Sequence, residues 1–183
     1  MNRAAINLAS CKIHFRESLR PATVCFVVDD GAVLLGRKTR GFGEGLWNGP
    51  GGKVEPGEGI EQAAIRETRE EVGVSPTALR KVAVLDFYFP DAPAGSGWSQ
   101  RVHVFLAGGW GGSPVETDEM CPKWFPLDEI PYGQMWEDDV CWLPAVLDGK
   151  FVTGDFLFGS DQRMKDYEVA IHERAEGLRV KTG

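Results

Sequence analysis

The segment from Gly52 to Val74 constrains the fold more than any other part of this chain. It reads GKVEPGEGIEQAAIRETREEVGV. Pro56-Gly57 predicts a turn, and Gly73 predicts a helix end, because glycine often occupies the position that follows a helix. We therefore expect a helix over residues 58–72. The residues spaced to pack this helix on a sheet are Ile65, Thr68 and Val72.

The same helix carries acidic side chains at a spacing that brings them together. Glu67, Glu70 and Glu71 are related as i, i+3 and i+4 and share one face. Glu58 can point back toward them, and Arg66 can hold one glutamate by a charge-assisted hydrogen bond. Clustered like charges repel, and carboxylate oxygens are good ligands for Mg²⁺ or Mn²⁺. The face is therefore either a metal site or a solvated acidic surface.

Length and charge limit the classes of protein to which the chain can belong. Its 183 residues suffice for one domain with its own core. A formal net charge of −7 argues against a partner that is a nucleic acid polymer, which needs a basic face. No apolar run approaches the roughly 18 residues of a membrane helix, so we expect no membrane partner. A small phosphorylated substrate is compatible if divalent metal lies between carboxylates and phosphates.

The remaining residues predict an α/β domain. Residues 23–28 and 32–35 are typical of two hairpin strands, and a glycine-rich loop follows at 41–52. Further strands are expected at 81–89, 101–107, 123–125 and 151–158, with a helix at 138–147. Because these elements do not alternate as regular βαβ units, we expect a mixed sheet with helices on both faces.

The 52–74 segment resembles the Nudix box, the pattern GX5EX7REUXEEXGU. Gly52 matches the first glycine, Glu58 follows it after five residues, and Arg66-Glu67 follow after seven more. Thr68 is the one departure, since the family usually has a bulky aliphatic residue there. A pattern with this many fixed positions is far more specific than a short motif. The chain therefore resembles the Nudix hydrolases.

Within that superfamily the chain is similar to the MutT-type oxidised purine nucleoside triphosphatases. Three stretches carry the similarity: RGFGEGLWNGPGGKVEPGE from Arg40, VETDEMCPKWFPLDEIPYGQMWEDD from Val115, and GDFLFGSDQRMKDY from Gly154. The resemblance covers residues 22–168, which we expect to form the Nudix domain. Residues 1–21 and 169–183 are then extensions at the two ends.

The resemblance implies a fold and a reaction. The family has an α/β/α sandwich around a mixed sheet, and it uses Mg²⁺ to direct water onto a phosphorus, releasing a nucleoside monophosphate and pyrophosphate. By position, the residues expected to hold the metal are Gly52, Glu67, Glu70, Glu71 and Glu119. Arg66 is expected to act with them in catalysis. Lys38 is expected to meet phosphate, with a solvated surface lysine as the alternative.

The resemblance also implies a pocket for the base. The residues expected there are Asn48, Asp138 and Asp139 on the purine edge, Phe42, Phe87 and Trp136 around the ring, and Thr23 on the floor. Core packing of the phenylalanines and helix capping by Asp138 are the alternatives. Pro50 replaces a family aromatic, and Gln100 follows the longer loop 90–100. These two departures leave the base preference open.

We therefore expect an enzyme that hydrolyses oxidised purine nucleoside triphosphates of the 8-oxo-dGTP type and so clears the nucleotide pool. The alternative is a Nudix hydrolase of another nucleotide, such as a dinucleoside polyphosphate or a nucleotide sugar. A non-catalytic nucleotide-binding module is less favoured, because the box keeps its carboxylates. We expect a cytoplasmic monomer. The basic residues of 1–21 are also compatible with a mitochondrial transit segment or a frayed terminus.

Overall fold

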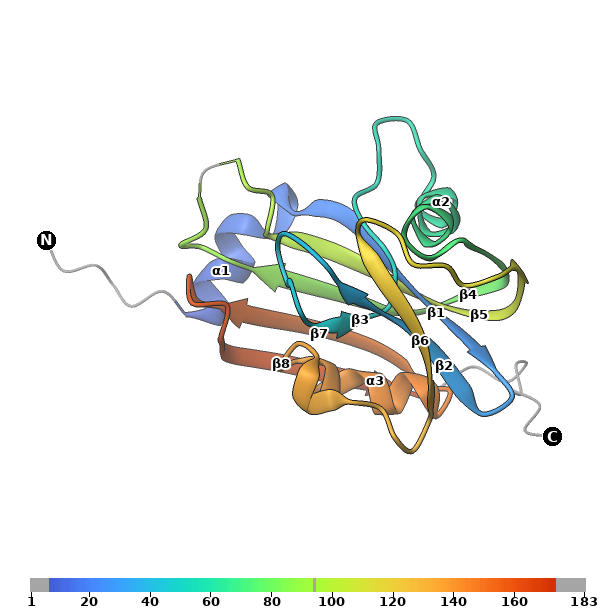
Figure 1. Cartoon of the computed structure of the whole chain (residues 1–183). Helices are drawn as coiled ribbons and strands as arrows, with labels where there is room; N and C mark the ends of the chain where they lie inside the picture. Colours follow the sequence, from blue (N-terminus) through green and yellow to red (C-terminus); the bar gives the residue numbers. More distant parts are fainter. Residues whose placement is uncertain (1–6, 94, 174–183) are drawn as a thin grey trace, which may run out of the picture.

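A mixed β-sheet organises the protein in the computed structural model, which describes residues 7–93 and 95–173 (Figure 1). Its eight strands run in the order β3-β2-β1-β5-β4-β7-β8, with β6 on the other edge of β2. Pairs β1–β5 and β4–β7 are parallel and the others are antiparallel, as predicted for a mixed sheet. The strands are β1 (Arg20–Asp29), β2 (Ala32–Lys38), β3 (Trp47–Asn48), β4 (Val74–Tyr88), β5 (Gln100–Gly112), β6 (Met120–Pro126), β7 (Phe151–Phe158) and β8 (Met164–His172).

Helices cover both faces of this sheet. They are α1 (Leu8–Phe15), α2 (Ile60–Val72) and α3 (Asp139–Leu147). Figure 1 shows α1 and α2 on one side and α3 on the other. Successive strand residues point to opposite faces, so Val27 packs with Val72 of α2 while Phe26 packs with Trp142 of α3. The expected α/β/α sandwich is confirmed. None of the described helices is long and apolar enough to cross a membrane.

Two predicted boundaries need correction. The helix α2 begins at Ile60 and not at residue 58, because Gly59 is its N-cap and donates its N–H to Gln62 Oε1 at 3.0 Å. Gly73 ends the helix as predicted, with a left-handed φ of 74°. The following strand begins immediately afterwards, at Val74, well before the predicted start at residue 81.

The packing face of α2 is confirmed at two of its three predicted positions. Thr68 and Val72 are buried, while Ile65 is only half-buried and Ala64 is buried beside them. The Thr68 hydroxyl donates to the carbonyl of Ala64 at 2.7 Å, so the buried polar group is satisfied within the helix. This explains how threonine replaces the usual aliphatic residue of the box.

Two elements lie where none was predicted. The edge strand β8 reaches His172, so it passes the expected domain end at residue 168. The helix α1 lies within the segment expected as an N-terminal extension, and its Leu8 is buried against Tyr88 of β4. Lys12 of α1 also contacts Asp155 of β7 at 3.0 Å. Part of residues 1–21 is therefore held on the sheet.

The strands β1 and β2 separate next to the glycine-rich loop. They share three residue pairs only, and the same edge of β2 then pairs with β3. The freed edge of β1 is hydrogen bonded to the loop instead: Thr23 N donates to Gly52 O, and Cys25 N donates to Pro50 O, each at 2.8 Å. A Cβ on Gly51 would lie 2.0 Å from Thr23 O, so this close approach requires glycine. The loop thus brings the start of the box beside β1.

Candidate active site

Arg66 lies at the centre of the acidic face of α2. Its guanidinium donates to Glu58 at 2.8 and 2.9 Å, to Glu67 at 2.8 Å and to Glu70 at 3.1 Å. The hydrogen bonds from Arg66 lower the pKa of Glu58 to about 2, with help from the N–H of Glu55. One guanidinium therefore offsets the repulsion among three carboxylates, where the sequence predicted contact with one.

Glu71 is the buried carboxylate of this cluster. Its Oε1 accepts from Lys38 Nζ at 2.9 Å and its Oε2 accepts from Gly51 N at 2.8 Å. Burial raises the pKa of Glu71, although the pair with Lys38 acts in the opposite direction. Lys38 is therefore a half-buried partner of the box and not a solvated surface lysine.

A cavity of about 520 Å³ lies beside the carboxylates. Glu67, Glu70 and Glu71 line it from α2, and Glu119 lines it from the segment before β6. Arg40 also lines this cavity and places its Nη2 3.1 Å from Glu119 Oε1. The fold therefore gathers the acids that the sequence predicted, although Glu119 is distant from the box along the chain.

The donors of this cavity fit a divalent cation by their chemistry, since Mg²⁺ prefers carboxylate and carbonyl oxygens. A Cβ on Gly52 would lie 2.6 Å from Glu67 Oε2, so glycine leaves the room that this carboxylate uses. Within residues 7–93 and 95–173, however, no three acidic, histidine or cysteine side chains already converge on one point. Arg66 donates to Oε1 of Glu67 and Lys38 donates to Oε1 of Glu71, so a metal ion would use the other Glu67 oxygen and would compete with Lys38 for Glu71.

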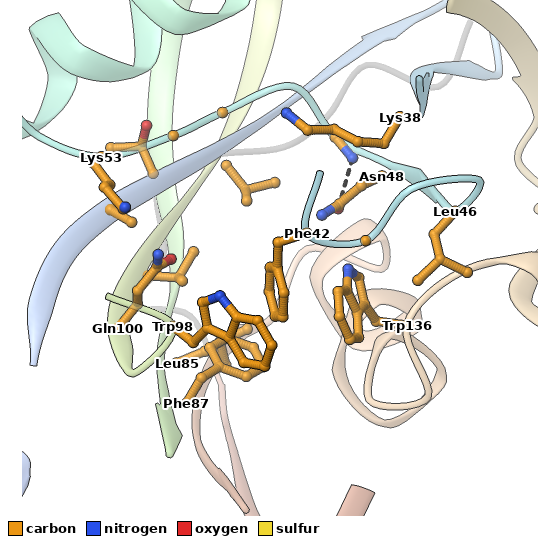
Figure 2. Close-up of a pocket in the computed structure, with 18 of the residues that line it drawn as sticks. Lys38, Phe42, Leu46, Asn48, Lys53, Leu85, Phe87, Trp98, Gln100 and Trp136 are labelled. Atoms are coloured by element: carbon orange, nitrogen blue, oxygen red, sulfur yellow. Dashed lines mark hydrogen bonds between the residues drawn. The ribbon is translucent and has the colours of Figure 1, made fainter. Parts of the chain in front are cut away.

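A larger cavity, of about 560 Å³, opens on the side of the sheet that α3 covers. It is lined by every residue predicted to meet the nucleotide: Thr23, Lys38, Phe42, Asn48, Phe87, Trp136, Asp138 and Asp139. Figure 2 shows the rings of Phe42 and Trp136 side by side, with centroids 4.9 Å apart. Phe87 lines the cavity and also stacks on Phe156 at 5.3 Å, so it serves both the pocket and the core.

Two polar groups of this cavity are available to a ligand. Asn48 Oδ1 accepts from Gly49 N at 2.8 Å, the bond drawn in Figure 2, which leaves the amide nitrogen of Asn48 free to donate. Thr23 Oγ1 is buried and has no hydrogen-bond partner among the described residues. A buried hydroxyl without a partner is uncommon, and a ligand in the cavity would supply one.

Asp138 and Asp139 line this cavity, and each is 2% exposed. Trp142 Nε1 donates to Asp138 Oδ2 at 2.8 Å, and Trp136 N donates to Asp139 Oδ2 at 3.1 Å. Burial raises the pKa of Asp138 to about 6. Burial and the neighbouring charge of Asp138 raise the pKa of Asp139 well above its ordinary value. Asp138 stands before α3 but makes no capping hydrogen bond, so helix capping does not explain the pair.

The sequence prediction did not single out Trp98 or Arg40 among the residues of these cavities. Trp98, from the loop between β4 and β5, lines the larger one, as does Gln100. A single tryptophan among small loop residues was the available signal for it. Arg40 was also missed, and together with Glu119 it lines both cavities. A ligand can therefore place an aromatic base in one cavity and a charged tail in the other.

The NUDIX domain family matches residues 18–146 of the chain. The chain is 48% identical over 136 residues to the oxidized purine nucleoside triphosphate hydrolase of Danio rerio, which covers 74% of this chain and 85% of that protein. The Mus musculus protein of the same name is 44% identical over 147 residues, covering 80% and 92%. The MutT protein of Bacillus halodurans has a TM-score of 0.71 at 27% identity, covering 82% of this chain and 97% of that one. Because the matched residues include the whole box and the acids of both cavities, the chain belongs to the Nudix hydrolase family.

Proposed function

We propose that this Nudix hydrolase cleaves oxidised purine nucleoside triphosphates of the 8-oxo-dGTP type to a nucleoside monophosphate and pyrophosphate. The observation that carries the proposal is the Asp138–Asp139 pair, buried in an aromatic cavity that adjoins the carboxylate cavity. The relatives in Danio rerio and Mus musculus are named for hydrolysis of this substrate class.

The chemistry of the pair suits an oxidised purine edge. 8-Oxoguanine differs from guanine at N7, which becomes a donor, and at C8, which gains a carbonyl. A protonated carboxyl group donates and an ionised one accepts, so Asp138 and Asp139 together can present both functions. The free amide nitrogen of Asn48 adds a donor on the same cavity. Phe42 and Trp136 line the cavity with apolar aromatic surface that suits a base.

Nudix hydrolases generally use a divalent metal ion, and Mg²⁺, with Mn²⁺ as a substitute, is our proposal for this chain. The groups that would hold it are the carboxylates of Glu67, Glu70, Glu71 and Glu119. Gly52, the other expected ligand, lies beside Glu67, and its carbonyl already accepts from Thr23 N. A bound ion supplies Lewis acidity to the phosphates and lowers the pKa of water. Arg66 keeps the carboxylates in place through its contacts with Glu67 and Glu70.

Lys38 and Arg40 are cationic side chains that lie where they could donate to the substrate phosphates. Lys38 lines the base cavity, and Arg40 lines both cavities, so the two lie along the path from base to carboxylates. Water attacks a phosphorus, the bond to the bridging oxygen breaks, and pyrophosphate departs with increased negative charge. Donation from Lys38 and Arg40 to phosphate oxygens would stabilise that charge.

Hydrolysis of another nucleotide is the second candidate, and Gln100 is the observation that favours it. Gln100 lines the larger cavity, and its Nε2 already donates to Gly97 O at 2.8 Å, so its amide oxygen remains as an acceptor for a different base edge. A non-catalytic binding module is disfavoured, because Glu67, Glu70 and Glu71 are all retained and line one cavity.

A turnover screen tests the proposal. The panel contains 8-oxo-dGTP, dGTP, a dinucleoside polyphosphate and a nucleotide sugar, each with Mg²⁺, with kcat/KM and products measured. We expect the highest kcat/KM for 8-oxo-dGTP, with pyrophosphate as product. Asp138→Asn and Asp139→Asn should each reduce the preference for 8-oxo-dGTP over dGTP by about 1–3 kcal/mol, since a buried edge group loses its partner. A higher kcat/KM for another class, or orthophosphate as main product, would reject the proposal.

A further inference from the structure

The ring of Phe42 lies between two indoles. Its centroid is 4.6 Å from that of Trp98 and 4.9 Å from that of Trp136, with interplanar angles of 33° and 34°. Figure 2 shows this order, with Phe42 between the two tryptophans. Phe89 contacts Phe42 and Trp98 edge-on, at 5.4 and 5.8 Å. These rings form a continuous stack along the wall of the base cavity, and Trp98 lies at one end of the stack.

The loop between β4 and β5 holds Trp98 in position. Gln100 Nε2 donates to Gly97 O at 2.8 Å, directly before Trp98. Directly after it, Ser99 Oγ accepts from Phe89 N at 2.9 Å. The residues on both sides of Trp98 are thus anchored to the strands, and its ring packs against the core cluster. Trp98 is a fixed part of the cavity wall and not a pendant side chain.

Phe42 depends on this support. It is 37% exposed and stands between Gly41 and Gly43, both with φ of 79°. Glycine leaves the backbone freedom at such positions, so the local chain alone does not hold the ring. Because Phe42 lies between Trp98 and Trp136, loss of Trp98 would uncover one side of its ring and would remove an aromatic ring from the cavity lining.

From these contacts we infer that Trp98 is a specificity-determining residue, which selects bicyclic over monocyclic bases by completing, with Phe42 and Trp136, the aromatic lining of the base cavity. The inference rests on the proposed function in that it places a purine in the larger cavity. A stacked wall recognises ring area and is tolerant of the groups on the ring edge. A purine covers more of that wall than a pyrimidine does.

Two parts of the cavity then have separate tasks. The wall of Trp98, Phe42 and Trp136 sets the preference for purines over pyrimidines. The buried pair of Asp138 and Asp139 sets the preference for an oxidised over an unmodified purine. Loss of Trp98 should therefore lower kcat/KM for 8-oxo-dGTP and for dGTP by the same factor. Loss of a group that contacts the base edge would instead change the ratio between the two.

The test compares wild type with Trp98→Ala, Trp98→Phe and Trp110→Ala. Trp110 is a matched control, because it stacks on Trp124 at 5.7 Å in the other core cluster, on the α2 side. Steady-state kcat and KM are measured for 8-oxo-dGTP, dGTP and dCTP, with Tm as a check on folding. Trp98→Ala should lower kcat/KM for both purines about tenfold, through KM, and affect dCTP less. Trp98→Phe should restore most of this loss, and Trp110→Ala should match wild type.

Three results would overturn the inference: an unchanged purine KM in Trp98→Ala, an equal loss for dCTP, or a changed ratio of 8-oxo-dGTP to dGTP. Failure of the proposed function looks different, because wild type itself would then prefer another substrate class. The effect of Trp98→Ala on any purine nucleotide that wild type hydrolyses still decides the role of Trp98. Loss of kcat with unchanged KM would also reject the role in base selection.

Discussion

The ammonium of Lys38 lies 2.9 Å from the carboxylate of Glu71, and this pair joins β2 to α2 at the edge of the carboxylate cavity. The side chain of Glu71 is 3% exposed and that of Lys38 is 25% exposed, so the negative charge is the more deeply buried one. A charge in that position needs its partners, because an unpaired buried carboxylate is strongly destabilising. A metal ion is a partner that could replace Lys38 beside Glu71 during catalysis, which would free the ammonium of Lys38 for a substrate phosphate.

Replacing Glu71 by glutamine should remove activity and keep the fold. Glu71→Gln should lower Mg²⁺-dependent kcat by roughly 100-fold or more, because it takes a negative oxygen ligand from the site. The amide oxygen can still accept from Gly51 N, and Lys38, which is 25% exposed, can turn to Glu119, 3.8 Å from its ammonium, so the fold should be kept. Wild type treated with a chelator should lose activity and recover it with Mg²⁺. Glu61→Gln, an exposed change in the first turn of α2, is the control and should match wild type. Full activity in both Glu71→Gln and chelated wild type would remove the metal from the mechanism.

Adjacent glycines should give opposite results when each is changed to alanine. A Cβ on Gly51 would lie 2.0 Å from the backbone oxygen of Thr23, which cannot move without breaking β1, so Gly51→Ala should lose about 1–3 kcal/mol of stability. A Cβ on Gly52 would meet the end of the Glu67 side chain at 2.6 Å, which can swing away. Gly52→Ala should therefore fold normally and lose turnover.

Denaturant unfolding and Mg²⁺-dependent kinetics on the two glycine variants provide the measurement. The expected pattern is a lower free energy of unfolding for Gly51→Ala and a lower kcat for Gly52→Ala. Equal turnover of Gly52→Ala and wild type would mean that the placement of Glu67 is not critical for the reaction.

The stability of the protein should depend on pH through Asp139. Burial raises its pKa in the folded state, so the folded protein holds a proton that the unfolded chain releases. The contribution is complete below the ordinary pKa of aspartate, near 4, and is lost as pH rises through the folded value. Asp139→Asn carries no charge, so its stability relative to wild type should increase with pH in that window, by about 1.4 kcal/mol per pH unit for one retained proton.

Unfolding free energies from pH 4 to 8 test this pH dependence. Asparagine can still accept from Trp136 N, so the hydrogen bond of Asp139 is preserved in the variant. After burial, the charge of Asp138 is the next cause that raises the pKa of Asp139, and Asp138→Asn shows how much of the effect comes from that charge. Asp148→Asn, at the exposed C-terminal end of α3, is the control and should follow wild type. Parallel curves for wild type and Asp139→Asn would show that Asp139 is ionised throughout.

The acidic helix could be predicted because its signals are local. The spacing of Glu67, Glu70 and Glu71 sets a common helical face without reference to any other part of the chain, and Gly73 ends the helix by its own left-handed conformation. The resemblance then supplied Glu119 and the base residues, which no local spacing indicates. Strands with a buried apolar face, such as β1 and β7, were recognised for the same local reason.

The elements that were missed have no such pattern. The strand β8 is mostly exposed, so its residues show no apolar face, and its conformation comes from pairing with β7. The helix α1 carries only two buried residues, and Lys12 holds it on the sheet through a contact with Asp155. In both cases the stabilising partner is a distant segment, so a window along the chain contains only half of the interaction.

The working geometry of the site also comes from distant segments. The residue types predicted a carboxylate cluster and a base pocket, because charge, aromatic area and helical spacing are properties of the sequence itself. That Lys38 meets Glu71, that Arg66 holds three acids, and that Trp98 supports Phe42 depends on how strands and loops are brought together. Such contacts form only when the whole sheet has assembled. Each joins two segments that are far apart along the chain, and their distance in the sequence does not predict their distance in space.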